Sequence, residues 1–362
     1  MTDVKTGPDS DAADWLTFRG ADPDTTAASA ICESTPTKCQ ARTRLYRNGV
    51  LEAEGFPVDK ISDYLEDDSA VVWLDLRDPD RGDLDVLSAE FGLHPLAVED
   101  AVHEHQRPKL DRYRSHLFLA VYAVHLDEAS CTLATSELSA FITERALITV
   151  RKDDGLDIGG VVTHWDASPD LAKFGTGYLV WGLIDHVVDG YFSVVQALDD
   201  TAEELEDDLF DDTPGHYDIQ RRSFQLRKSL VLLRRIVLPT REVVNSLMRR
   251  DLRIVNEPLQ PYYQDVYDHV LRAAEWTDGL RDLVATILET NLTIQGNHMN
   301  VITKKVTSWA AIIAVPTFVT GFYGMNVPYP GFGRPAGMAA AAIIMLVTAA
   351  VLYLVFKRHD WL

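Results

Sequence analysis

The sequence is poor in cysteine and in positive charge, and each shortage excludes a class of protein. Its three cysteines, Cys32, Cys39 and Cys131, are too few for a disulfide framework, and we expect them to be free thiols. The chain has 34 Lys and Arg against 55 Asp and Glu, a formal net charge of −21. Nucleic-acid binding normally needs a basic face, so we predict no nucleic-acid partner. The acidity is compatible with a protein that handles cations.

Residues 42–260 also lack the short motifs of common catalytic sites. No glycine-rich phosphate loop, nucleophile elbow or metalloprotease helix occurs there, and Gly159-Gly160 indicates only a turn. Residues 1–14 are acidic and polar, so they do not resemble a signal peptide. We therefore predict that the protein is not an enzyme. The lack of a signal peptide is consistent with a large cytoplasmic part.

The C-terminal third, in contrast, contains a very long helical pattern. Small and apolar residues recur at alternating spacings of four and three, as in a helix packed lengthwise against partners. The pattern continues past Lys304 and Lys305 into the uncharged stretch 309–322, where Pro316 would be tolerated as a kink in a membrane helix. A helix over 261–323 would be about 90 Å long. The recurring positions are Val266, Val270, Ala273, Thr277, Leu280, Val284, Ile287, Asn291, Ile294 and His298.

Two uncharged stretches predict a pair of membrane-spanning helices. Residues 336–356 form an uncharged run of 21, enough to cross a hydrocarbon core of about 30 Å. The shorter stretch 308–323, taken alone, also fits a buried core helix, but the neighbouring full-length stretch favours a hairpin across the bilayer. Residues 324–335 would form the connecting loop, and 357–362 a short basic tail.

Basic residues predict the orientation of this hairpin. Lys304 and Lys305 precede the first span, Lys357 and Arg358 follow the second, and the loop carries only Arg334. Because positive charge accumulates on the cytoplasmic side, both chain termini are predicted in the cytoplasm and the loop outside.

Before the long helix, the composition predicts a tail and two further parts. Residues 1–41 have a disordered-tail composition, and 166–260 form a helical hairpin. Residues 42–165 read as a mixed α/β domain, with helical stretches at 58–65 and 84–91. The predicted strands are 43–50, 71–76, 117–125, 138–143 and 146–151.

The predicted hairpin carries opposite charges on its two helices. An acidic cluster ends the first helix (178–210), Pro214-Gly215 breaks the chain, and a basic helix (219–238) returns. The acidic tip either gathers divalent cations or pairs with the basic helix. Pro239 and Pro258 mark the approach to the long helix.

Four local motifs together resemble the CorA-type magnesium transporters, and the resemblance covers nearly all of residues 42–362. The four motifs are Tyr323-Gly324-Met325-Asn326 between the two spans; Phe91-Gly92-Leu93-His94-Pro95-Leu96 with Glu99-Asp100 and His105-Gln106-Arg107-Pro108-Lys109; Leu233-Arg234 with Pro239 and Arg241-Glu242-Val243; and Asp265-Val266-Tyr267-Asp268-His269.

The resemblance implies a homopentamer in which each subunit contributes an α/β cytoplasmic domain, a long stalk helix and two transmembrane helices. It implies a funnel-shaped channel in the plasma membrane that passes hydrated Mg²⁺, and also Co²⁺ or Ni²⁺, under control of cytoplasmic Mg²⁺. The implied partners are copies of the same chain, the lipid bilayer and hydrated divalent cations. No organic cofactor is implied.

The resemblance also assigns the pore residues. Gly324, Met325 and Asn326 match the selectivity filter, in which Gly324 lets the chain leave the helix and Met325 packs. Mg²⁺ dehydrates reluctantly, and a ring of Asn326 oxygens can accept hydrogen bonds from its water shell without stripping it. Asn326 as an ordinary helix-end residue, and small residues as mere packing, are the alternatives. The residues assigned to the pore face are Asn300, Thr303, Val306, Ala314, Thr317 and Gly321.

A regulatory Mg²⁺ site between cytoplasmic subunits is implied as well. Motif matching assigns it to Asp100 and Asp265, with Glu99 and Asp268 as neighbouring alternates. Bound Mg²⁺ would neutralise carboxylates that face one another across subunits and so favour a closed state.

The outer loop departs from the family pattern, because 327–335 contains Arg334 and no carboxylate. This departure leaves the affinity and the ion preference open. Zinc transport within the same family is a second hypothesis, which Gly324-Met325-Asn326 alone does not exclude. A third is a membrane-anchored cytoplasmic sensor, which would need neither the long stripe nor Asn326 at the outer end of the helix.

Overall fold

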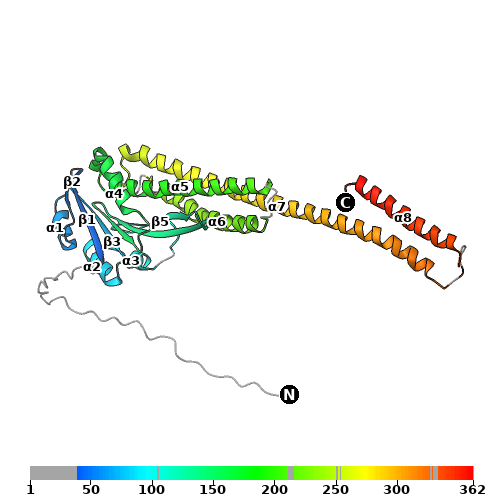
Figure 1. The fold of residues 1–362 in the computed structure, drawn as a ribbon. Helices are drawn as coiled ribbons and strands as arrows, with labels where there is room; N and C mark the ends of the chain where they lie inside the picture. Colours follow the sequence, from blue (N-terminus) through cyan, green and yellow to red (C-terminus); the bar gives the residue numbers. More distant parts are fainter. Residues whose placement is uncertain are drawn as a thin grey trace, which may run out of the picture. The chain divides into compact units, whose positions relative to one another are not determined.

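The computed structural model describes residues 39–361 apart from 104–105, 211–215, 250–251, 253, 327 and 329–332. A mixed sheet comes first, and long helices follow it along the chain (Figure 1). Most of the predicted tail, 1–38, lies outside the described residues. The first strand begins at Gln40, two residues before the predicted start of the α/β part.

The sheet has seven strands in the order β2-β1-β3-β7-β6-β5-β4. β3 and β7 are parallel, and every other neighbouring pair is antiparallel. The five predicted strands are confirmed, whereas the short edge strands β2 and β4 were not predicted separately. The strands are β1 (Gln40–Arg47), β2 (Val50–Glu54), β3 (Ala70–Arg77), β4 (Lys109–Arg112), β5 (Leu117–Asp127), β6 (Thr132–Ile142) and β7 (Ala146–Arg151).

The predicted helices are present, α3 was not predicted, and two further points need correction. The described helices are α1 (Ile61–Leu65), α2 (Arg81–Phe91), α3 (Pro95–Val102), α4 (Ile158–Ala167), α5 (Thr176–Phe210), α6 (His216–Leu247), α7 (Gln260–Tyr323) and α8 (Pro335–Arg358).

The first correction concerns Gly159-Gly160, which lies inside α4 and not in a turn. A Cβ on Gly160 would stand 2.6 Å from the His186 ring, so this glycine lets α4 approach α5 closely.

The second correction concerns Pro239, which lies inside α6. An internal proline costs a helix about 3 kcal/mol. Burial of neighbours such as Val237 and Val244 offsets this cost, at roughly 1.5–3 kcal/mol for each fully buried side chain. The packing of α6 therefore outweighs the local preference of proline.

Two cores lie on opposite faces of the sheet. Alternate residues of the central strands point into each: Trp73 and Leu147 into the core shared with α4–α7, and Leu74 and Ile148 into the core shared with α1–α3. All six residues of β7 are buried, as expected for a strand covered on both faces.

The base of α7 is held by α5 and α6 (Figure 1). The Tyr263 hydroxyl donates to the Gly177 carbonyl of α5 at 2.8 Å, and Arg234 Nε of α6 lies 2.6 Å from Asp278 Oδ1. Every predicted stripe position from Val266 to Asn291 is buried, because α5 and α6 of the same chain cover it. The partners that the stripe requires are therefore found within the chain as far as Asn291.

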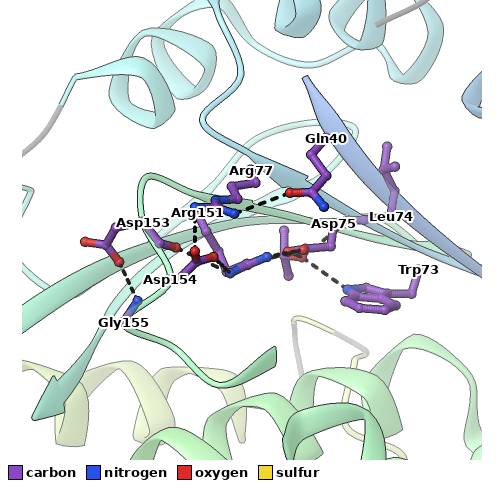
Figure 2. A network of polar contacts seen from close by, with 10 residues as sticks. Gln40, Trp73, Leu74, Asp75, Arg77, Arg151, Asp153, Asp154 and Gly155 are labelled. Carbon is purple, nitrogen blue, oxygen red and sulfur yellow. Dashed lines mark hydrogen bonds and ion pairs between the residues drawn. The ribbon is translucent and has the colours of Figure 1, made fainter. Parts of the chain in front are cut away.

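A buried ion pair joins the parallel strands β3 and β7. Arg151 points its guanidinium at Asp75, with Nη2 2.7 Å from Oδ2 and Nε 3.0 Å from Oδ1 (Figure 2). Thr149 donates to the same carboxylate at 2.8 Å and accepts from Trp73 Nε1 at 3.1 Å. The Asp75 side chain is only 1% exposed and that of Arg151 6%, so each charge depends on the other.

We predict that Asp75→Asn lowers the free energy of unfolding of the α/β part by about 3–5 kcal/mol, because it leaves a buried guanidinium without its counter-charge. Asp68→Asn is the matched control. The Asp68 side chain is fully exposed beside Arg145, and its loss should cost only a small fraction of that free energy. Urea unfolding followed by tryptophan fluorescence measures both. Equal midpoints for the two variants would contradict the role given to the pair.

Candidate functional site

The helix α7 leaves the α/β part after Asn291. Asn291 is 1% exposed, Ile294 is half-buried, and every residue of 296–307 is exposed. His298, the last position of the predicted stripe, is thus uncovered in the single chain. Burial resumes at Ser308, where α8 begins to cover α7.

The ends of α7 and α8 form an antiparallel hairpin. A shallow cavity of about 290 Å³ is lined by Val319, Thr320, Tyr323 and Gly324 of α7 and by Met338, Ala341 and Met345 of α8. Both helices are long and apolar enough to cross a membrane, and their apolar windows are almost entirely unburied. Since α8 has 24 residues, it reaches back to about Asn300 at the same rise per residue. Lys357 and Arg358 therefore lie at the same end of the hairpin as Lys304 and Lys305.

One side of α7 faces α8, and the predicted pore residues lie on the other side. From Ser308 onward, the α7 residues with reduced exposure are Ser308, Ala311, Ile312, Val315, Pro316, Val319 and Tyr323. At about 100° per residue, Thr303, Val306, Ala314, Thr317 and Gly321 cluster roughly opposite this set, with Asn300 at the edge of the cluster. All six predicted residues are exposed in the single chain.

The threonines on this outer side have a defined hydrogen-bonding arrangement. Thr303 donates to the Met299 carbonyl and Thr317 to the Ile313 carbonyl, each at 2.9 Å. Each hydroxyl proton is used within the helix, so the oxygen lone pairs remain available as acceptors on the exposed face.

The predicted filter residues lie where α7 ends. Gly324 N donates to the Thr320 carbonyl at 2.8 Å and Met325 N to the Phe322 carbonyl at 3.3 Å, and Asn326 follows, exposed. Gly324 directly follows the last residue of α7 with φ −81°, an ordinary helical value, so the chain leaves the helix there without a left-handed backbone. A Cβ at this position would stand 3.0 Å from the Thr320 carbonyl, and this close approach favours glycine. Met325 is 49% exposed in the single chain.

The predicted regulatory acids lie in two separate places. Asp100 and Glu99 belong to α3, whereas Asp265 and Asp268 belong to the start of α7. Asp100 Oδ2 lies 2.6 Å from Lys109 Nζ, and Asp265 Oδ2 lies 3.8 Å from His269 Nε2. Asp268 accepts from Gln264 Nε2 at 3.0 Å. Within the described part of the chain, no group of three or more His, Cys, Asp or Glu side chains is arranged to hold a metal ion.

Both predicted carboxylates suit a hard cation such as Mg²⁺. Their oxygens are the ligand type that Mg²⁺ prefers, and the Asp265 side chain is 67% exposed. Asp100 already binds one cationic group, the ammonium of Lys109. The two predicted carboxylates thus lie on different elements, α3 and α7, each with a neighbouring side chain of its own.

The sequence interpretation missed Asp185 of α5, which lies close enough to Asp265 to sense its charge. Burial, the neighbouring Asp189 and Asp265 raise the pKa of Asp185 to about 6, although His164 and His269 oppose the rise. His164 Nε2 lies 3.3 Å from its carboxylate. The signal was present in the sequence, because Asp185 is a lone acid within the apolar stretch 178–188.

The acidic tip of α5 is partly neutralised within the chain. Arg222 of α6 bridges Glu204 and Asp208 at 2.8 Å each. This supports the interpretation of complementary helix faces for these two acids. Asp211 and Asp212, also part of the predicted tip, lie outside the described residues.

Comparison with known proteins gives consistent results. A family described as "CorA-like Mg2+ transporter protein" matches residues 68–358. A cobalt/magnesium transport protein CorA from Thermotoga maritima is 30% identical over 306 residues, covering 82% of this chain and 85% of that protein. The corresponding protein from Methanocaldococcus jannaschii is 26% identical, covering 84% of this chain and 95% of that protein.

Two further similarities bear on fold and on ion preference. The solved structure of the M. jannaschii CorA magnesium transporter superimposes with a TM-score of 0.72 at 24% identity, covering 89% of this chain and 98% of that chain. A zinc transport protein ZntB from Yersinia pestis is 23% identical over 272 residues, covering 75% of this chain and 82% of that protein. With its α/β part, its long helix and its apolar hairpin, the chain belongs to the CorA family of divalent-cation transporters.

Proposed function

We propose that the protein is a homopentameric channel that passes hydrated Mg²⁺, and also Co²⁺ or Ni²⁺, across the plasma membrane under control of cytoplasmic Mg²⁺. The observation that carries this proposal is the exposed face of α7, which lies opposite α8 and leads to Asn326 at the end of the helix. One hairpin cannot enclose a hydrated ion, so several copies must surround the path, each presenting this face.

The chemistry of this face suits a cation that keeps its water. The waters of hydrated Mg²⁺ donate hydrogen bonds, and the oxygens of Thr303 and Thr317 are oriented to accept them. Asn300 adds an amide oxygen near the inner end, and Asn326 adds one at the outer mouth. Val306, Ala314 and Gly321 would keep the path free of charge. Neutral oxygens bind the ion weakly enough for it to leave again.

The Gly324-Met325-Asn326 segment would form the selectivity filter. Asn326 supplies the carboxamide oxygens, Met325 borders the mouth, and Gly324 lets the chain pass close to the Thr320 carbonyl. Capture of the ion from outside would rest on Asn326, since the connecting loop carries Arg334 and no carboxylate.

The charges beside the hairpin support cytoplasmic termini. Lys304, Lys305, Lys357 and Arg358 gather at one end, and such clusters accumulate on the cytoplasmic side of membranes. The α/β part, at that end, would then sense cytoplasmic Mg²⁺ through Asp100 of one copy and Asp265 of the next. Asp185, Glu99 and Asp268 would support these carboxylates.

Zinc transport is the second candidate, and the similarity to ZntB is the observation that favours it. The identity to the CorA proteins is higher, at 30% and 26%, which is why Mg²⁺ is preferred as the cargo. Uptake of Zn²⁺ without Mg²⁺ would reverse this preference.

We predict that Asn326→Ala lowers Mg²⁺ uptake at least about tenfold, because the substitution removes the amide oxygens that accept hydrogen bonds from the hydrated ion at the filter. Uptake by cells that depend on the protein for Mg²⁺ measures the effect. Met338→Leu, on the exposed surface of α8 and outside the filter, is the control and should retain most uptake. Normal uptake by a correctly assembled Asn326→Ala protein would refute the assignment of the filter.

A cysteine scan tests which side of α7 faces the ion path. In a background with Cys32, Cys39 and Cys131 replaced by Ser, we expect Ala314→Cys, Thr317→Cys and Gly321→Cys to react with a small, water-soluble cationic thiol reagent. Val315→Cys and Val319→Cys point toward α8 and should react at least about tenfold more slowly. Mass spectrometry measures the labelling rates and so shows which side of α7 is accessible to water. Equal rates on the two sides would exclude a water-filled path along the proposed face.

Asp265→Lys should weaken inhibition of transport by cytoplasmic Mg²⁺ at least about fivefold, because it replaces a carboxylate that would bind Mg²⁺ by an ammonium that repels it. The control is Asp282→Lys, the same change at an exposed position of α7 roughly 25 Å further along the helix. Mg²⁺ inhibition curves on inside-out vesicles provide the measurement. Identical curves for Asp265→Lys and wild type would place the regulatory site elsewhere.

A further inference from the structure

Lys109 holds its ammonium between two carboxylates in the cavity that contains Asp100. Its Nζ lies 2.6 Å from Asp100 Oδ2 and 2.9 Å from Asp111 Oδ2. The same atom lies 5.5 Å from the centre of the Phe118 ring. The Lys109 side chain is only 21% exposed, so it is held against the protein and does not extend into solvent.

The local fold brings these groups together. β4 begins at Lys109, and the alternation of side chains along a strand places Lys109 and Asp111 on the same face. α3 places Asp100 within reach of that face, in a shallow cavity of about 470 Å³ that Glu99 and Arg112 also line. Three carboxylates thus share one small region, and Lys109 contacts two of them.

Stability alone is a weak reason for this arrangement. The Asp100 side chain is 25% exposed and that of Asp111 42%, and ion pairs at such positions contribute under about 1 kcal/mol. The arrangement has a clearer effect on cation binding. Lys109 occupies one acceptor position of Asp100 Oδ2, and its positive charge opposes the approach of Mg²⁺ to the same carboxylate.

Lys109 and Mg²⁺ differ in how their binding to Asp100 depends on concentration. Lys109 is covalently tethered, so it acts at a high effective concentration at all times. Mg²⁺ carries twice the charge of the lysine, and it occupies Asp100 in a larger fraction of molecules as its concentration rises. The long side chain of Lys109 can keep its ion pair with Asp111 when it releases Asp100, so its ammonium still has a counter-charge.

We propose that Lys109 is a tethered counter-cation that competes with Mg²⁺ for Asp100 and so raises the Mg²⁺ concentration at which the regulatory site responds. The inference rests on the regulatory role of Asp100 within the proposed function. Lys109 is a positioning residue in this scheme, because it acts on a ligand and not on the transported ion.

The test uses purified full-length protein in detergent, with MgCl₂ titrated from an EDTA-treated start. Melting temperature and protection from proteinase K, whose cleavage does not require Lys or Arg, report binding without any transport measurement. Lys109→Met keeps the side-chain stem and removes the charge, and it should lower the half-saturating Mg²⁺ concentration about three- to tenfold. Lys109→Arg restores the charge and should return the midpoint toward wild type.

Arg112→Met is the matched control, since it removes one positive charge from the rim of the same cavity without freeing Asp100. It should shift the midpoint less than about twofold. An unchanged midpoint in Lys109→Met, or an equal shift in Arg112→Met, would overturn the inference. Lys109→Gln provides a second uncharged variant, and melting temperatures in EDTA verify that each variant is folded.

Asp100→Asn distinguishes the two levels of the argument. If it abolishes the Mg²⁺ response while Lys109→Met leaves the midpoint unchanged, competition by Lys109 is wrong and the regulatory site stands. If Asp100→Asn retains the wild-type response, the regulatory site is not at Asp100, and both proposals about this cavity fail.

Discussion

The continuity of α7 is the constraint on which the rest of the structure depends. This helix has 64 residues, so it extends over roughly 95 Å as one element. Its first half buries a stripe against α5 and α6, and its second half shares one side with α8. The helix continues through its internal Pro316 and so joins the α/β part to the apolar hairpin in one element. Its base is held by contacts such as Tyr263 with Gly177 and Arg234 with Asp278.

The environment of each segment of α7 accounts for its residues. Between Val266 and Asn291 the stripe is apolar or small, because the two neighbouring helices exclude water from it. Between 296 and 307 the helix is exposed all round and carries amides, hydroxyls and two lysines. Beyond Ser308 α7 carries no charged residue, and Thr317, on the side away from α8, donates its hydroxyl proton within the helix. A path for a hydrated cation requires this last combination of an apolar outer surface and acceptor oxygens on one face.

Much of this organisation follows from the sequence, because the patterns that encode it are local. The stripe of α7 repeats with the period of a helix, α8 contains one continuous uncharged run, and the five longer strands are short runs rich in β-branched or aromatic residues. The structure confirms all three predictions. Pro239 misled the prediction of α6 because its cost is local, whereas the packing that offsets it comes from distant residues. Gly159-Gly160 was misassigned for the same reason, since the His186 ring that requires Gly160 belongs to another helix.

The candidate sites were less predictable than the elements that carry them. Asn326 and the exposed face of α7 were assigned from motif and spacing, and the structure places all of them on accessible surface. Asp185 was missed because its relation to Asp265 arises only when α5 packs beside α7. The pairing of Lys109 with Asp100 was equally hidden, since β4 is a four-residue edge strand with little pattern of its own. Pairwise geometry of this kind depends on tertiary contacts and is not encoded in any single segment.

The central claim, that copies of this chain form a path for hydrated Mg²⁺, is tested most directly by ion flux into liposomes. Purified wild-type protein, shown to be pentameric by native mass spectrometry, would be reconstituted around a fluorescent indicator and challenged with Mg²⁺, Co²⁺ and Zn²⁺ in parallel. The account predicts entry of Mg²⁺ and Co²⁺ at rates well above those of protein-free liposomes. Flux of Zn²⁺ alone, or of none of the three ions, would contradict it.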